Sequence, residues 1–308
     1  MASPYVISVL LTAHNCENFL EDTLESLKNA CIGVQELVEI ILVNDASADN
    51  TSKMLHAFAA ENAHASVFDI SLRNIGKVRN FAVSQCSGQY VMMLDGDDQL
   101  LKNSLADIVN CLEKGNPDAL FAPLNEVYEN KQRVAKWHGL ITTPLSQHQA
   151  IEKFLIHREL QAHFIGQFIK REILEKFQFP DLTCYEDAWL FPTILEVSHH
   201  ILYAQHSPYL YFKRAQSLSN DLDAEKISML ILATQKMDDV FQEKYRNLLS
   251  CHWINIAHKY YPMIKDENDL VTVKNAISKI PVISFLADTK VRTSFKKKYF
   301  KMKLKGLF

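Results

Sequence analysis

The chain has few glycines and few cysteines for its length, and it has no long apolar run. Eight glycines in 308 residues argue against an architecture built on loops or glycine hinges. Six scattered cysteines without a Cys-x-x-Cys pair favour reduced thiols in a cytosolic protein, and argue against a zinc site or a disulfide framework. No apolar run approaches the roughly 20 residues of a membrane-spanning helix. We also expect no secretory signal, because the first residues lack a basic segment.

Positive charge is concentrated near the end of the sequence. Residues 290–308 contain seven lysines, one arginine and no acid, or +8, so the remainder carries −3 − 8 = −11. Aromatic and aliphatic residues interleave with these cations, and a basic amphipathic segment suits an anionic membrane surface. A solvated terminal helix or a frayed tail is an equally good explanation. The acidic remainder argues against nucleic acid as a partner.

Apolar runs alternate with amphipathic segments over the first 115 residues. We expect strands at 5–12, 38–43, 67–72 and 90–94, separated by helices at 18–30, 50–60 and 75–87. This order predicts an α/β fold, with a Rossmann-like, mostly parallel sheet flanked by helices. Further strands are expected at 119–126, 134–140, 201–204 and 208–212, and residues 223–280 are predicted to be helical.

One apolar run, Tyr90–Leu94, ends abruptly in Asp95, Asp97 and Asp98. Residues i and i+2 of an extended backbone point to the same side, so Asp95 and Asp97 are expected to point one way. A divalent cation best offsets the repulsion of two such carboxylates, and Mg²⁺ and Mn²⁺ prefer carboxylate and phosphate oxygens. The alternative is a solvated loop whose acids cap the next helix.

Polar residues stand at the carboxyl ends of all four expected strands. In sheets of this kind, ligands bind beyond these ends, so the four clusters predict one cleft. Chance clustering is the alternative, since loops are polar in general. The clusters are 12–15, Asn44 with Asp45, Arg73 with Asn74, and 95–97.

These segments together resemble the family 2 glycosyltransferases of GT-A fold, over about residues 5–220. Six weak motifs occur in the family's order: 14–20, 44–51, 74–80 with its Asn-x-Gly and Arg-Asn, the Asp-x-Asp at 95–97, the Glu-Asp pair at 186–187, and 209–219 with its Ser-x-Ser. Two residues depart from the pattern. Ala46 replaces a glycine, and His14 replaces a common tyrosine.

The resemblance implies an inverting hexosyl- or N-acetylhexosaminyltransferase that uses a UDP-sugar donor. It places Thr12 and His14 at the nucleotide base, with Asp45 accepting a hydrogen bond from uracil. It also places Asn74 and Arg79 near the base and the diphosphate. A helix-surface arginine is the alternative for Arg79.

By the same resemblance, Asp95 faces the ribose or a metal, and Asp97 ligates that metal, Mn²⁺ or Mg²⁺. Asp187 is implied as the general base, while Glu186 positions the acceptor or the sugar. Without the other motifs, the acid pair would simply cap a helix. A segment that closes over the diphosphate is implied at Lys213, Arg214, Ser217 and Ser219.

The resemblance further implies a nucleotide-binding half at about 1–115 and an acceptor half at about 116–220. The helix-rich pattern of the remaining residues predicts a helical region at 221–308 that ends in the basic tail. The expected acceptor is a glycan or a lipid-linked molecule of lipopolysaccharide or capsule synthesis, used in the cytoplasm or at the inner face of the cell membrane.

Three other classes of protein fit the sequence less well. A nicotinamide-dependent enzyme needs Gly-x-Gly-x-x-Gly after the first strand, where residues 12–17 contain no glycine. A nucleotidyltransferase would need a glycine-rich basic loop at the same place. The third class is a non-catalytic sugar-nucleotide or carbohydrate-binding protein of the same fold, against which the three aspartates at 95, 97 and 187 argue.

Overall fold

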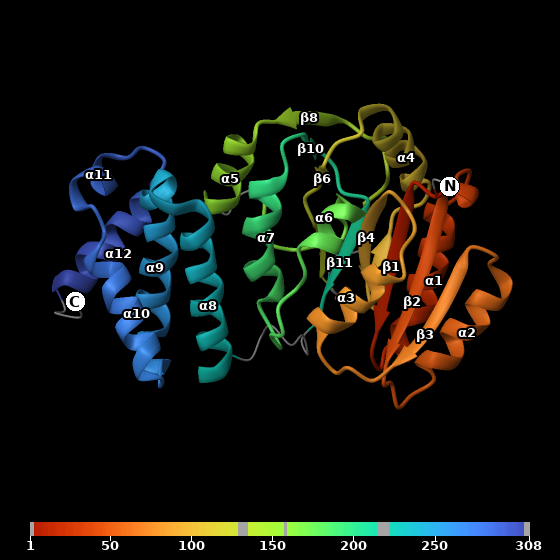
Figure 1. The fold of residues 1–308 in the computed structure, drawn as a ribbon, viewed down its shortest axis with the longest axis horizontal. Helices are drawn as coiled ribbons and strands as arrows, with labels where there is room; N and C mark the ends of the chain where they lie inside the picture. Colours follow the sequence, from red (N-terminus) through yellow and green to blue (C-terminus); the bar gives the residue numbers. More distant parts are fainter. Residues whose placement is uncertain (1–2, 129–134, 157–158, 215–221, 305–308) are drawn as a thin grey trace.

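An eight-stranded sheet forms the centre of the molecule (Figure 1). The structure is a computed structural model that describes residues 3–128, 135–156, 159–214 and 222–304. The strand order is β3-β2-β1-β4-β9-β6-β10-β8, and neighbours are parallel except where β9 or β8 takes part. The strands are β1 (Ile7–Ala13), β2 (Val38–Asp45), β3 (Ala65–Ile70), β4 (Tyr90–Asp95), β6 (Ala119–Phe121), β8 (Thr142–Leu145), β9 (Phe168–Lys170) and β10 (Ile201–Ala204).

The three central strands are almost continuously apolar because they are covered on both faces. Every residue of β1 is buried, as are all but one residue each of β2 and β4. The edge strand β3 is only partly covered. This burial explains why the predicted strands at 5–12, 38–43 and 90–94 were readable from hydrophobicity alone.

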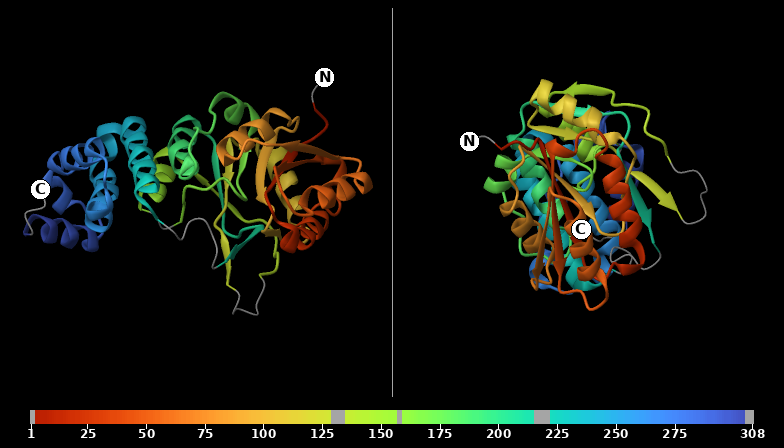
Figure 2. Two further views of the ribbon diagram at one scale, coloured as in Figure 1. Left: turned by 90° about the horizontal axis from the view of Figure 1, so that it is seen from below. Right: turned by 90° about the vertical axis from the view of Figure 1, so that its right-hand side faces the viewer.

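Helices pack on both faces of the sheet (Figure 2). On α1, a stripe of Leu20, Leu24 and Leu27 is buried, as the spacing of three and four residues requires. The helices are α1 (Glu17–Ala30), α2 (Thr51–Glu61), α3 (Ile75–Ser84), α4 (Ser104–Gly115), α5 (Gln147–Ile156), α6 (Arg171–Lys176) and α7 (Glu186–Val197), with one 3₁₀ turn at Gln35–Leu37.

A second, three-stranded sheet has the order β5-β11-β7. It joins Gln99–Leu100 (β5), Tyr209–Lys213 (β11) and Asn125–Tyr128 (β7), with β11 antiparallel to β5 and parallel to β7. This small sheet brings the residues that follow β4 next to the residues around position 210.

Five further helices form the C-terminal region, beginning with α8, which packs on α7 (Figure 1). None of the described helices combines the length and apolar character that a membrane crossing needs. The division at 220/221 remains a prediction. The helices are α8 (Ala224–Phe241), α9 (Arg246–Tyr260), α10 (Glu267–Ser278), α11 (Val282–Ala287) and α12 (Thr293–Leu304), with 3₁₀ turns at Gln242–Tyr245 and Tyr261–Met263.

Several predicted elements differ from the structure. The expected strand at 119–126 is two strands in different sheets, because Pro123 between them has no amide hydrogen for a ladder. Residues 135–140 form no strand, and Trp137 instead donates a hydrogen bond to Asp107 on α4 (2.7 Å). The helix expected at 75–87 ends at Ser84. Gly88 lies against β1, where a Cβ atom would approach the Ser8 nitrogen to 2.7 Å.

Candidate active site

The polar ends of the central strands lie side by side at one edge of the sheet. In the strand register, Thr12 is opposite Asp95 on β4, and Ala13 is opposite Asn44 on β2. Asn44 is in turn opposite Asp69 on β3 and donates a hydrogen bond to its carboxylate (2.7 Å). The strand-end clusters therefore share one edge of the sheet.

Asp45 holds the turn that follows β3. One carboxylate oxygen accepts hydrogen bonds from the amides of Leu72 (2.7 Å) and Arg73 (3.0 Å), and the residue is only 8% exposed. Arg73 has a φ of 50°, in the left-handed region, so its amide must be held to keep this conformation. The carbonyl oxygen of Asp45 lies 2.6 Å from Nδ1 of His14. Two of the residues expected at the base, His14 and Asp45, therefore lie in contact.

Asn74 begins helix α3 and also ties it to a distant segment. Its side-chain oxygen accepts a hydrogen bond from the Lys77 amide (3.0 Å), and its side-chain nitrogen donates to Asp181 (3.0 Å) and to the carbonyl of Leu182 (3.1 Å). It thus acts as an N-cap that positions the segment before α7.

Arg79 is the buried centre of the site. Its side chain is 5% exposed, and its Nη1 atom lies 2.8 Å from Glu186 and 2.5 Å from Asp187. Its Nη2 atom lies 3.7 Å from Asp95. The acid pair at the start of α7 and the acidic end of β4 therefore meet on one guanidinium, although more than 90 residues separate them.

Three buried or half-buried carboxylates share this single cation, and the pKa values of two of them, Asp95 and Asp187, reflect the imbalance. Burial raises the pKa of Asp187 far above the usual aspartate range, and Arg79 only partly opposes it. Burial likewise raises the pKa of Asp95, again against Arg79. Burial acts to lower the pKa of Arg79, but its three acidic neighbours outweigh this and raise it.

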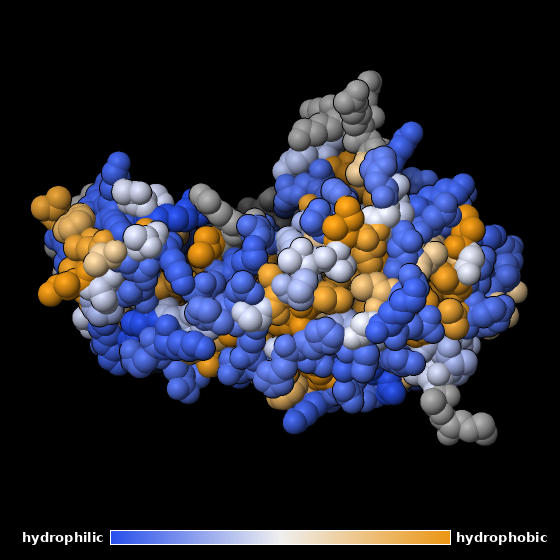
Figure 3. Space-filling model, turned by 90° about the horizontal axis from the view of Figure 1, so that it is seen from above, coloured by the Kyte–Doolittle hydropathy of each residue, from blue (hydrophilic) through white to orange (hydrophobic). Residues whose placement is uncertain are grey.

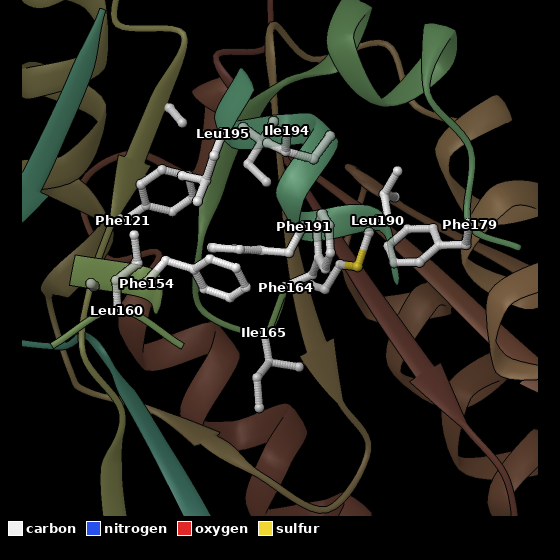
Figure 4. Close-up of a cluster of buried hydrophobic side chains, with 14 of the residues drawn as sticks. Phe121, Phe154, Leu160, Phe164, Ile165, Phe179, Leu190, Phe191, Ile194 and Leu195 are labelled. Atoms are coloured by element: carbon white, nitrogen blue, oxygen red, sulfur yellow. The ribbon is translucent and has the colours of Figure 1, made fainter. Parts of the chain in front are cut away.

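Buried aromatic side chains, among them Phe164, Phe179 and Phe191 (Figure 4), form a floor beside Arg79 and Asp187. The Phe179 ring lies 5.5 Å from the Arg79 guanidinium and 4.7 Å from the ring of Phe164. The backbone amide of Phe164 donates a hydrogen bond to the second Asp187 oxygen (3.4 Å). The ring of Phe191 on α7 lies 5.7 Å from that of Phe164. This cluster excludes water from one side of the carboxylates, which causes the burial that raises the pKa of Asp187.

The three aspartates at the end of β4 and just after it have three different environments. The extended backbone ends at Asp95. The alternation that was expected to point Asp95 and Asp97 to the same side therefore does not continue to Asp97. Asp97 pairs with Arg214 (2.5 Å), whose guanidinium lies 4.0 Å from the Phe19 ring centre. Asp98 is 1% exposed and accepts hydrogen bonds from the Tyr209 hydroxyl (2.7 Å) and the amide of residue 212 (2.9 Å). Burial raises the pKa of Asp98 to about 8.

A groove of about 210 Å³ lies beside Asp97. Its walls come from α1, from the segment after β4 and from the β11–β7 sheet. Charged side chains of both signs and aromatic rings therefore border the groove. Its lining residues are Phe19, Asp22, Asp97, Gln99, Val127, Phe212, Lys213 and Arg214.

The residues at the end of β4 fit a hard divalent cation. The side chains of Asp95 and Asp97 are 33% and 41% exposed, so protein does not fully enclose either carboxylate group. Among the described residues, no three His, Cys, Asp or Glu side chains are arranged to hold a metal alone. A cation here would therefore complete its coordination with phosphate and water oxygens, the ligands that Mg²⁺ usually keeps. The excess of carboxylates over arginines around Arg79 favours added positive charge.

Comparison with known families agrees with this arrangement. Residues 8–177, or 170 of the 308, match the family described as glycosyl transferase family 2. The chain belongs to glycosyl transferase family 2. The predicted family is thus confirmed, and the matched region contains β1, β2 and β4, whose ends carry the site.

Named relatives of this family 2 protein come from bacteria. The uncharacterized glycosyltransferase MG025 of Mycoplasma genitalium is 28% identical over 202 residues, 61% of this chain and 63% of the relative. The minor teichoic acid biosynthesis protein GgaB of Bacillus subtilis is 24% identical over 220 residues, 70% of this chain and 24% of GgaB. The alignments thus span less than two thirds of these relatives.

Solved structures confirm the GT-A fold of the family 2 protein. The crystal structure of Staphylococcus aureus TarS 1–349 with UDP-GlcNAc superposes with a TM-score of 0.69 at 17% identity, and covers 97% of this chain and 92% of TarS 1–349. GalNAc-T7 with UDP, GalNAc and Mn²⁺ gives a TM-score of 0.59 at 15% identity, over 93% of this chain and 57% of that chain. At such identities the likeness concerns the fold.

The structure of the family 2 protein brings together most of the predicted site residues. Ser217 lies outside the described residues, and the roles of the others stay predictions. The sequence reasoning named Asp98 without giving it a role in the site, and it missed Phe164 and Phe179. Asp98 directly follows the apolar run 90–94 and the other acids of its motif. The burial expected for that run could have indicated that the Asp98 side chain is also buried. The two phenylalanines stand in segments without a motif.

Proposed function

We propose that this protein is an inverting glycosyltransferase that moves a hexose or N-acetylhexosamine from a UDP-sugar to a hydroxyl of a glycan or lipid-linked acceptor. One observation carries the proposal. Arg79 joins the acidic end of β4 to the Glu186–Asp187 pair, at the edge of the sheet where the strand-end polar residues gather. This arrangement places a candidate base next to a candidate donor site.

Asp187 is our candidate for the general base. The acceptor oxygen would form a bond to the anomeric carbon while the bond from that carbon to the diphosphate oxygen breaks. The bonding electrons leave with UDP, and the hydroxyl proton goes to Asp187. A raised pKa suits this task, because it brings the proton affinity of the carboxylate closer to neutral pH.

Arg79 is our candidate for the residue that positions this base. It fixes one Asp187 oxygen (2.5 Å) while the Phe164 amide fixes the other, so the carboxylate has one orientation. The same guanidinium holds Glu186, which we propose contacts the acceptor or the sugar. The predicted contact of Arg79 with the diphosphate stays a proposal, and Arg79 would need to share its N–H groups to make it.

Asp95 and Asp97 are our candidates for holding Mn²⁺ or Mg²⁺ beside the diphosphate. A bound divalent cation would supply positive charge that stabilises the leaving UDP. Arg214 pairs with Asp97 and lies just after β11, outside any helix or strand. We propose that its guanidinium also contacts the diphosphate. Thr12, His14, Asp45 and Asn74 remain our candidates for the nucleotide end of the donor site.

We propose that the acceptor belongs to a cell-surface polymer. Two relatives support this choice, since one is named for minor teichoic acid synthesis and another, TarS, as a poly(ribitol-phosphate) beta-N-acetylglucosaminyltransferase. Lipopolysaccharide and capsule remain our specific candidates. A lipid-linked acceptor would be reached at the inner face of the cell membrane, so we propose that location.

UDP release in the presence of Mn²⁺ tests the proposal. The wild-type protein is expected to release UDP from at least one UDP-sugar, faster when acceptor glycans are added. The Asp187→Asn variant should bind UDP normally in calorimetry but release it roughly a hundredfold more slowly, or slower still. Asp239→Asn, an exposed change on α8, is the matched control and should behave as the wild type. Full turnover by Asp187→Asn would remove Asp187 from its role.

A non-catalytic sugar-nucleotide-binding protein is the second candidate. One observation favours it: both oxygens of Asp187 are already engaged, by Arg79 and by the Phe164 amide. Such a protein would bind UDP-sugars without releasing UDP. Binding together with a complete absence of release, across UDP-hexoses and UDP-N-acetylhexosamines with every acceptor tested, would support this candidate and refute the first.

A further inference from the structure

The C-terminal helices expose large apolar side chains at one end of the molecule, where Figure 3 shows apolar surface gathered. Leu304 at the end of α12 is 89% exposed, and Ile283 on α11 is 87% exposed. Phe300 on α12 is 50% exposed. Single exposed apolar residues are ordinary, but three large ones on two adjacent helices call for a partner.

Helix α12 has an inner and an outer face, and both carry apolar residues. Tyr299 and Met302 are buried, so they form the inner face. Lys297, Phe300, Lys301 and Leu304 are spaced by three and four residues, which places them along the opposite side. All four are exposed. We call these four residues the C-terminal face.

Four of the five lysines of α12 divide into two groups. Lys296 donates to the carbonyl oxygens of Leu286 (2.7 Å) and Asp288 (2.8 Å), which attaches α12 to the end of α11. Lys298 similarly donates to a side chain on α9 (2.9 Å). By contrast, no described carboxylate lies within ion-pair distance of Lys297 or Lys301, the two lysines of the C-terminal face. Helix α12 itself contains no acid.

We propose that the C-terminal face docks on an anionic lipid bilayer. Phe300 and Leu304 would enter the boundary between headgroups and acyl chains, while Lys297 and Lys301 contact lipid phosphates. Apolar residues flanked by cations and free of acids are what such a surface requires. A second copy of the chain would bring the same cations together, so charge complementarity favours the bilayer.

This proposal rests on the proposed location at a membrane and names the surface responsible. The C-terminal helices lie at one end of the long axis, and β1, β2 and β4 lie in the other half (Figure 1). Docking through this end would leave the strand-end site uncovered. Lipid binding can therefore be measured separately from UDP release.

Co-sedimentation of the full chain with phosphatidylcholine vesicles, with and without phosphatidylglycerol, tests the proposal. The wild type is expected to bind only the anionic vesicles, and less tightly as salt is added. Lys297→Glu with Lys301→Glu should weaken binding by about thirtyfold or more, since each surface cation contributes about 1 kcal/mol. Phe300→Ser with Leu304→Ser should weaken it about tenfold at unchanged charge.

Lys53→Glu with Lys102→Glu is the matched control, because it makes the same change in net charge with two exposed lysines of the N-terminal half. Control binding equal to that of the wild type is expected. The proposal would be overturned if the control lost as much binding as the variants of the C-terminal face. It would also be overturned if the wild type did not bind anionic vesicles. A dimer broken by the Phe300 and Leu304 changes would instead identify a second copy as the partner. We expect each of these variants to release UDP as the wild type does. A loss of lipid binding can then be distinguished from a failure of the proposed reaction.

Discussion

Replacing Arg79 by alanine is expected to destabilise the fold strongly. The side chain is 5% exposed and is the cation shared by Asp95, Glu186 and Asp187. Removing one partner of a buried ion pair typically costs about 3–5 kcal/mol, because the remaining charge stays buried without compensation. Here the remaining groups are three carboxylates, so the loss should lie at the upper end of this range.

The loss should also depend on pH in a definite direction. Without Arg79, the pKa values of Asp95 and Asp187 rise further, because the guanidinium favours their ionised forms. At acidic pH these groups bind protons, and the fold no longer contains uncompensated negative charge. The destabilisation by Arg79→Ala should therefore be smaller at acidic pH and larger at alkaline pH.

Urea unfolding of the wild type and two variants at several pH values measures this effect. Arg246→Ala is the matched control, because Arg246 pairs with Glu243 at the surface and should cost about 1 kcal/mol or less. Arg79→Lys keeps the charge but not the planar fork, so an intermediate loss is expected. If Arg79→Ala costs no more than Arg246→Ala, or if its cost is the same at every pH, the shared-cation reasoning is refuted.

Three further predictions follow from the acidic residues of the site. Asp97→Ala should weaken UDP binding in calorimetry when Mn²⁺ is present and change it little without metal; equal affinity in both conditions would contradict the assignment. The rate of transfer should fall with decreasing pH well before an ordinary aspartate is protonated, because burial raises the pKa of Asp187; a rate that holds down to the usual aspartate range would exclude Asp187 as base. In the folded protein Asp98 keeps its proton up to about pH 8, whereas in the unfolded chain it loses the proton near pH 4. The stability that its protonation contributes to the fold is therefore present at acidic pH and is lost as the pH rises through about 8. Between about pH 4 and pH 8, the free energy of unfolding should therefore fall less for Asp98→Asn than for the wild type, as midpoints of urea unfolding would show. Equal losses in the two proteins would refute the titration of Asp98 as the cause.

Much of the fold could be predicted because the central strands are buried on both faces. Such strands are continuous apolar runs, and the polar residues that interrupt them mark their carboxyl ends. The ends of β1, β2 and β4 were located in this way. The later strands were harder to predict, since β6 and β7 are short and Pro123 separates them into two sheets.

The residues of the candidate site could be predicted, but the contacts between them could not. The acids at 95, 97, 186 and 187 stand in recognisable motifs, so they could be named. The pairing of Arg79 with Glu186 and Asp187 could not, because it depends on how α3 and α7 pack across 107 and 108 residues of sequence. The aromatic floor under Asp187 likewise arises from packing and leaves no motif.

A double-mutant cycle between Asp95→Asn and Asp187→Asn tests most directly that the end of β4 and the start of α7 form one site. Urea unfolding at alkaline pH would give the free energies of unfolding of the wild type, both single variants and the double variant. Because both carboxylates share Arg79, we predict a coupling free energy of about 0.5–3 kcal/mol. Changes that add within about 0.3 kcal/mol would show two independent acidic spots and would contradict the account.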